Sequence, residues 1–347
     1  MEEYSDIIEP CTGFLTYGNA TLLLFDKGVP LLATDPWIDG SCYFGSWSLP
    51  VSPSRSLIND LGKTKYVWIS HGHPDHLHVQ SLKKYLPVDV QILLPDHYGL
   101  RIYRDLSSAG FRCNVLTSGK IYSLSDNIRI ACFPDYYQDS ILVAHIGGIA
   151  AVVNLNDSQS ILQRRKVLPL VNSFEDRFVL KLVNFGDTDI MTYCDEDWNI
   201  IPPPQKQDYE PLGTSYVNIL RKWNCNITSP FSASHIYSHP DTLWLSSLVA
   251  APEDHSKAFD ETKGLLIPAY FYYEATTRSV TPIAYPSSNT IVEKLISDTL
   301  LKPPINTRFS GSDIQLATNY FHRIERLRHR YKALTFYSKE NSFSIDI

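Results

Sequence analysis

The chain has 347 residues and a formal net charge of −6, with 44% hydrophobic and 20% charged residues. These values are typical of a globular protein, and a chain of this length buries roughly three quarters of its unfolded surface. The acidic balance argues against nucleic acid as a partner. The basic runs, such as Arg164-Arg165-Lys166, are short and indicate a solvated helix or loop face.

Six cysteines are spread along the chain without a CxxC pair. The segment Met1-Glu2-Glu3-Tyr4 is acidic where a secretory leader would be basic. We therefore expect a cytoplasmic protein with reduced, mostly buried thiols. No apolar run approaches the length of about 18 residues that a membrane-spanning helix requires.

The first half of the chain combines predicted strands with predicted helices. Asp26-Lys27-Gly28 and Gly147-Gly148 are turn signals, each between two apolar runs that we interpret as a hairpin. The predicted strands of this half cover residues 21–25, 29–34, 66–70, 90–94, 128–133, 141–145 and 149–154. The predicted helices cover residues 80–86 and 98–109.

The second half repeats this order more loosely. The predicted elements are strands over 178–185 and 227–231, a helix over 215–223, an apolar stretch over 264–269, a final helix over 313–334 and a hairpin from Thr335 onward. Two β-rich halves flanked by helices indicate one layered core rather than two independent domains. We expect this core to span residues 1–295, with residues 296–347 as an extension packed on it.

The strongest signal for chemistry directly follows the predicted strand 66–70. His71, His73, Asp75 and His76 fall within six residues. Alternate residues of an extended segment point the same way, so His71 and His73 can reach one metal ion. Asp75 and His76 can then face a second ion. Imidazoles with a carboxylate suit Zn²⁺ or Fe better than Mg²⁺ or Ca²⁺.

This segment resembles the HxHxDH signature of the metallo-β-lactamase superfamily. Further segments resemble one branch, which includes the ascorbate-phosphate lactonase, N-acyl-phosphatidylethanolamine phospholipase D and CMP-sialic acid hydroxylase types. These segments are Ala33–Trp37 with Trp47, Asp139–Val143, Val152–Asp157, Ser234–Tyr237 and Asp241–Trp244. The resemblance covers residues 20–245 and implies an α/β fold, the four-layered αββα sandwich, here with a C-terminal helical and hairpin extension.

The resemblance also implies one or two divalent transition metal ions, with Zn expected first and Fe or Mn as alternatives. The matching ligands are His71 and His73 for the first ion, Asp75, His76 and His235 for the second, and Asp157 as a bridge between them. Asp157 and His235 each follow a predicted strand, which agrees with a place at a strand end beside the cluster. The alternatives are a turn aspartate and a structural histidine, and His239 competes with His235.

The sequence departs from the superfamily at one ligand of the first ion. The superfamily usually supplies another histidine just before the segment that begins at Asp139, but residues 134–139 contain none. Asp135, Gln138, Asp139 and water are the alternatives for this position. The same segment holds Tyr136 and Tyr137, which we expect either to pack or to line the pocket.

Other candidates are weaker. We expect Asp35 beneath the cluster, where its carboxylate would orient His76 or another ligand. His78 is expected to point away or to support a ligand, and His97 to be a helix cap or a surface residue. The aromatic run Tyr270–Tyr273 contacts either an organic substrate or, as we favour, the core.

We therefore predict a metal-dependent hydrolase in which a metal-bound hydroxide attacks a phosphoester, lactone, ester or amide of a small organic substrate. Asp75 and Asp157 are the expected catalytic carboxylates. One alternative is an iron-dependent oxygenase on the same site, which would need an external reductant because the chain has no Rieske pattern. Another is a degenerate metal-binding interaction protein. The sequence does not identify the substrate or the oligomeric state.

Overall fold

The computed structural model describes residues 11–159, 161–187, 190–195, 199–240, 242–283, 310–322, 333–337 and 342–346. The chain divides into two compact units, Met1–Thr299 and Leu300–Ile347. Within the described residues, no helix is long and apolar enough to cross a membrane. Asp241, which belongs to one segment of the resemblance, lies outside the described residues, as do residues 323–332 of the predicted final helix.

The first unit contains two large sheets and one small sheet. The first sheet has eight strands in the order β18-β17-β1-β2-β3-β6-β7-β8. Its strands are β1 Gly13–Tyr17, β2 Thr21–Asp26, β3 Val29–Thr34, β6 Tyr66–Trp68, β7 Gln91–Pro95, β8 Arg112–Leu116, β17 Phe271–Glu274 and β18 Ser279–Pro282. From β3 to β8 the neighbouring strands run parallel.

The second sheet has seven strands in the order β16-β14-β13-β12-β11-β10-β9. Its strands are β9 Ile121–Ser123, β10 Ile128–Pro134, β11 Ser140–Ile146, β12 Ala150–Asn156, β13 Asp176–Lys181, β14 Ile227–Pro230 and β16 Leu265–Leu266. Strands β12, β13 and β14 run parallel, so their carboxyl ends share one edge. The small sheet comprises β4 Ser41–Cys42, β5 Trp47–Ser48 and β15 Ile236–Tyr237.

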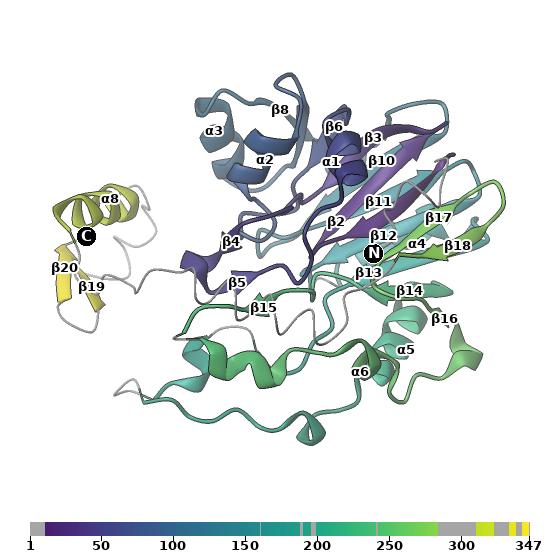
Figure 1. The fold of residues 1–347 in the computed structure, drawn as a ribbon. Coiled ribbons are helices and arrows are strands. Elements are labelled where there is room, and N and C mark those ends of the chain that lie inside the picture. The colour runs from purple at the N-terminus through teal and green to yellow at the C-terminus, as the bar shows by residue number, and fades with distance from the viewer. Residues whose placement is uncertain are drawn as a thin grey trace. The chain divides into compact units, whose positions relative to one another are not determined.

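Helices cover the outer faces of both large sheets (Figure 1). The α-helices of the first unit are α1 Arg55–Leu61, α2 Val79–Tyr85, α3 Arg101–Ser108, α4 Arg164–Val171, α5 Leu212–Trp223 and α6 Pro252–Ser256. Short 3-10 helices are η2 Tyr43–Gly45, η3 Ile190–Tyr193, η4 Lys206–Asp208, η5 Leu243–Leu248 and η6 Glu261–Lys263. The first sheet carries α1, α2 and α3, and the second carries α4 and α5.

The main core lies between the two large sheets. Apolar side chains of both sheets form one buried cluster there, and the rings of Phe14 on β1 and Phe178 on β13 meet edge to face with centroids 5.0 Å apart. Two further apolar clusters join each sheet to its helices. These three cores make the predicted αββα sandwich and confirm the predicted fold class. The aromatic run on β17 packs in the core, as favoured from sequence.

Both predicted turn signals form tight turns. Lys27 and Gly28 have φ values of 50° and 78°, and Gly147 and Gly148 have values of 60° and 70°. In β2–β3, where Asp26 pairs with Val29, the loop has two residues, and two successive positive φ values are what a hairpin turn of the I′ type requires. In β11–β12, where Ile146 pairs with Ala150, the loop has the three residues Gly147–Ile149. The hairpins β2–β3 and β11–β12 are therefore set by local sequence.

Some predicted boundaries are wrong. The strand predicted over 178–185 ends at Lys181, because the chain leaves the sheet beyond that residue. In the second unit the described helix is α8, Gly311–His322. Ala333 and Leu334, predicted as its end, instead begin β19, Ala333–Tyr337, which pairs with β20, Ser342–Asp346, as an antiparallel hairpin. Cross-strand pairing thus overrides the helical pattern there.

Candidate metal centre

Five of the predicted ligands converge at the edge where β6 and β12 end. His71, His73 and Asp157 form one group of potential ligand atoms, all within 4.8 Å of one another. Asp75, His76 and Asp157 form a second group by the same measure. Asp157 belongs to both groups, which is the arrangement expected of a carboxylate between two ions.

His71 presents its two ring nitrogens to different surroundings. Its Nε2 lies 2.8 Å from Nδ1 of His73 and 3.8 Å from Oδ2 of Asp157. Its Nδ1 lies 2.9 Å from Oγ of Ser70 and 3.5 Å from Oδ1 of Asp139. Burial lowers the pKa of His71 to about 2, which keeps its ring neutral. A neutral imidazole has the lone pair that a metal ligand needs.

Each ring nitrogen of His76 also lies near a carboxylate. Its Nδ1 lies 2.9 Å from Oδ2 of Asp35, which is fully buried and also accepts hydrogen bonds from the backbone N–H and the hydroxyl of Ser70, each at 2.7 Å. Its Nε2 lies 3.4 Å from carboxylate oxygens of both Asp75 and Asp157. The prediction that Asp35 contacts His76 is therefore confirmed by the geometry.

The local charges explain the titration of this histidine. Burial alone would lower the pKa of His76, but the carboxylates of Asp157, Asp75 and Asp35 raise it well above its ordinary value. In the same way, burial would raise the pKa of Asp157, but His76 and His71 hold it below its ordinary range. The proton of His76 therefore offsets part of the carboxylate charge around it, and a bound cation can take over that role.

Asp157 reaches the cluster through an irregular strand end. The pairing of β12 with β13 shifts register between Asn154 and Asn156, and Asn156 has a φ of 47°. Such a bulge bends the strand and redirects the side chains that follow it. Ser232, beyond the end of β14, fixes the result, because its hydroxyl donates a 2.7 Å hydrogen bond to Oδ1 of Asp157.

His235 lies apart from the two ligand groups. Its ring is buried and stacks on Trp47 with centroids 3.6 Å apart. Within the described part of the chain, neither of its ring nitrogens has a hydrogen-bond partner. A buried polar atom without a partner is costly, so this imidazole fits a site that receives a further ligand or ion. Its role as a ligand stays a prediction.

The segment just before β11, which has no histidine at the position where the resemblance led us to expect a ligand, forms well-defined contacts. Asp135 accepts hydrogen bonds from the backbone N–H groups of Tyr137 and Asp139 and from the hydroxyl of Ser158, so it caps the turn. Gln138 is exposed and donates to the carbonyl of Tyr98 at 3.3 Å. Only Asp139, among the three alternatives, faces a predicted ligand.

Asp139 lies beside Nδ1 of His71, on the ring edge opposite Nε2. Burial, together with the charge of Asp157, raises the pKa of its carboxyl to about 7. Both buried histidines thus meet a carboxylate at Nδ1 and direct Nε2 toward a common space. This carboxylate–histidine pair is the usual support of a metal-ligating imidazole.

The structure also places four weaker candidates. His78 caps α2 and contacts Oγ of Ser81 at 2.8 Å, so it points away from the cluster. His97 was predicted to be a cap or surface residue, but it is buried and its Nε2 lies 3.0 Å from the carbonyl oxygen of Asp139. Tyr136 and Tyr137 are 91% and 77% exposed, so they do not pack in the core.

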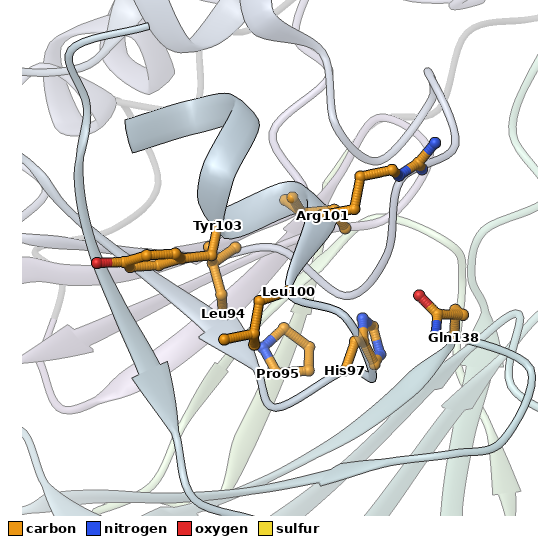
Figure 2. Close-up of a pocket in the computed structure, with 8 residues that line it drawn as sticks. Leu94, Pro95, His97, Leu100, Arg101, Tyr103 and Gln138 are labelled. Carbon is orange, nitrogen blue, oxygen red and sulfur yellow. The ribbon is translucent and has the colours of Figure 1, made fainter. Parts of the chain in front are cut away.

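His97 also lines a small pocket of about 10 Å³ with Arg101 and Gln138 (Figure 2). This volume is that of about one water molecule. The pocket therefore has no room for an organic substrate.

Sequence reasoning missed the residues that form hydrogen bonds to the predicted ligands. Asn19 and Tyr43 hold Asp75, and Ser232 holds Asp157. All three follow short strands or lie in loops, where a single Asn, Tyr or Ser carries no periodic signal. Lys181 was also missed, although it lies at the end of β13 and donates to the carbonyl of Ser158 at 3.1 Å.

A layered αββα sandwich with a His/Asp cluster at the shared edge of its sheets is the metallo-β-lactamase fold, and this chain has that fold. Among solved structures, an isothiocyanate hydrolase from Delia radicum gut bacteria is similar, with a TM-score of 0.50 and 14% identity over 80% of this chain and 100% of that one. No family model matches the chain.

Curated relatives match only in part. The chain is 35% identical over 95 residues to a protein of Mycolicibacterium smegmatis that is named as a Rieske 2Fe-2S iron–sulfur protein, covering 27% of this chain and 18% of the relative. It is 38% identical over 61 residues to a UPF0173 metal-dependent hydrolase of Anaeromyxobacter sp., covering 18% and 19%. It is 30% identical over 69 residues to the cytidine monophosphate-N-acetylneuraminic acid hydroxylase of Asterias rubens, covering 20% and 11%.

The chain thus spans about a fifth or less of the length of each of these curated relatives. The expected resemblance to metallo-β-lactamase fold proteins is confirmed. It includes the hydroxylase type of the expected branch and proteins named as metal-dependent hydrolases.

Proposed function

We propose that this chain is a metal-dependent hydrolase that acts on a small organic substrate. The observation that carries the proposal is the pair of ligand groups that share Asp157, each with its atoms within 4.8 Å. The names of the relatives with which the chain shares fold or sequence support the hydrolytic class. Similarity of fold alone would not support a hydrolytic reaction, because one fold hosts many chemistries.

The residues fit one or two divalent transition metal ions. His71, His73 and Asp157 would hold one ion, and Asp75, His76 and Asp157 would hold another, with His235 as a further donor. Mixed imidazole and carboxylate donors are the ligands of Zn²⁺ and iron sites in proteins. When bound, such an ion supplies a water of low pKa and polarises the oxygen of a scissile group.

The side chains of the protein have their own roles in this proposal. Asp35 and Asp139 hold the Nδ1 edges of His76 and His71 and so fix which nitrogen faces the site. Asp75 and Asp157 would orient the attacking water and accept its proton. The substrate class would be a phosphoester, lactone, ester or amide.

A second candidate, iron-dependent oxidation, is favoured by one observation. Two of the partly matching relatives are named for a Rieske iron–sulfur protein and for a hydroxylase. The same imidazole and carboxylate groups bind iron readily. An oxidative reaction would also require an electron donor.

Metal analysis of protein isolated without added metal separates the two candidates. We expect bound Zn²⁺, hydrolysis of at least one member of a panel of phosphoesters, lactones, esters and amides, and loss of both on chelation. Asp157→Ala should abolish turnover, whereas the exposed Asp105→Asn should not. Stoichiometric iron with visible absorption would replace the hydrolase proposal by the oxidative one. A chain that binds no transition metal would overturn both.

A further inference from the structure

Asn19 lies in the turn between β1 and β2 and is buried, with only 2% of its surface exposed. Its Nδ2 donates a 2.9 Å hydrogen bond to Oδ2 of Asp75. Its Oδ1 accepts a 3.0 Å hydrogen bond from the backbone N–H of Ser234, and its carbonyl oxygen accepts a 2.8 Å bond from the backbone N–H of Ser232. One residue thus contacts two segments that carry predicted ligands.

These contacts settle the orientation of the amide. The N–H of Ser234 can only donate, so it must face the amide oxygen of Asn19. The NH₂ group therefore faces Asp75, where it meets a carboxylate acceptor. The orientation follows from the chemistry of the two partners, and it gives Asn19 a donor role toward Asp75.

Asp75 is held on both of its oxygens. The hydroxyl of Tyr43 donates to Oδ1 at 2.8 Å, and Asn19 donates to Oδ2. Oδ2 is also the oxygen that lies 3.4 Å from Nε2 of His76, so it is the oxygen nearest the second ligand group. Rotation of the carboxylate would break one or both of these hydrogen bonds.

We propose that Asn19 is a positioning residue that fixes the carboxylate of Asp75 in the second ligand group and ties it to the loop that carries His235. The proposal rests on the metal centre proposed above. An amide suits this task because it supplies a donor and an acceptor without a charge. A lysine or arginine at this place would compete with the metal ion for Asp75.

The turn that carries Asn19 is shaped for this contact. Gly18 has a φ of 61°, and an added Cβ there would lie 3.2 Å from the carbonyl oxygen of Trp37. A side chain at this position would therefore strain the turn and press on the segment after β3.

The test compares Asn19→Ala and Asn19→Leu with the wild type. Leu has the same branched shape as Asn, fills the side-chain space and removes both polar contacts, whereas Ala also leaves a cavity, so the pair separates hydrogen bonding from cavity formation. Thr16→Val is the matched control, because Thr16 is also buried near the end of β1 but donates to the carbonyl of Ala269, away from the ligands. The measurements are Zn²⁺ affinity by competition with a chromophoric chelator and the visible spectrum of the Co²⁺ form.

We expect both Asn19 variants to bind the more weakly held ion about 10 to 100-fold less tightly, as removal of a supporting hydrogen bond typically does. Their Co²⁺ spectra should change, and those of Thr16→Val should not. Folded variants with wild-type affinity and spectrum would overturn the proposal. So would variants that stay unfolded with and without Zn²⁺, since Asn19 would then serve stability. A wild-type chain that binds no metal would instead overturn the proposed function.

Discussion

At the scale of single residues, the main feature of this site is that a carboxylate lies beside Nδ1 of each of two buried histidines. Asp35 contacts Nδ1 of His76 at 2.9 Å, and Asp139 lies 3.5 Å from Nδ1 of His71. In each histidine, Nε2 therefore faces the ligand groups. Asp139 therefore contacts the predicted ligand His71 on the ring edge opposite Nε2, in the segment where the resemblance led us to expect a histidine.

The role of Asp35 can be tested by Asp35→Asn. The amide would still contact Ser70, but it would no longer offer His76 a charged acceptor. We expect Zn²⁺ affinity to fall about 10 to 100-fold, with a smaller effect on the folded fraction. Competition titration against a chelator measures the affinity, and the exposed Asp105→Asn serves as control. Wild-type affinity in a folded Asp35→Asn variant would contradict this role.

At the scale of elements, local sequence accounts for the two predicted hairpins and for several buried strands, but the buried strand β1 was not predicted. Strand β12 was predicted from its apolar run, and its hairpin from two glycines. Helix α1 was missed, although Ser54 accepts a capping hydrogen bond from the N–H of Leu57. That serine was the available signal.

Helix α6 offers a test of stability that is separate from the metal. Oδ2 of Asp254 accepts a 2.9 Å bond from the N–H of Ala251 at the helix start and a 2.9 Å bond from Lys206, and Oδ1 accepts a bond from Lys257. Burial alone would raise the pKa of Asp254, but these hydrogen bonds lower it to about 2. The carboxylate thus stabilises the fold when it is ionised.

The pH dependence of the free energy of unfolding follows from the lowered pKa of Asp254. A carboxyl whose folded pKa lies below its unfolded value of about 3.9 contributes its full stability above that value and loses it as pH falls toward the folded pKa. We expect Asp254→Ala to lower the free energy of unfolding by about 1 kcal/mol at pH 7, and the difference from wild type to shrink between about pH 4 and pH 2. Denaturant titration measures both, with Glu253→Ala as control. A difference that is constant with pH would contradict the assignment.

At the scale of the whole molecule, the fold brings together candidate ligands that are distant in sequence. The loop after β6 and the loops after β12 and β14 meet at one edge of the paired sheets, and this convergence places Asp157 beside His71 and His76. The prediction that residues 296–347 pack on the first unit stays a prediction.

Metal binding should stabilise the first unit. A ligand that binds only the folded state adds about 2.7 kcal/mol at a concentration 100-fold above its Kd. We expect Zn²⁺ at that excess to raise the melting temperature by several degrees and chelation to reverse the change. Asp157→Ala should lose most of the effect, because Asp157 belongs to both ligand groups. An unchanged melting temperature on chelation of metal-loaded protein would contradict this expectation.

The sequence by itself determined the compact His71–His76 cluster, the two glycine-bearing hairpins and the layered fold, because each depends on neighbours within a few residues or on apolar periodicity. Only the tertiary structure decided that Asn19 holds Asp75 and that Asp139 faces the far nitrogen of His71. Those contacts join residues 56 and 68 positions apart, and they depend on side-chain directions at strand ends, which local sequence does not specify.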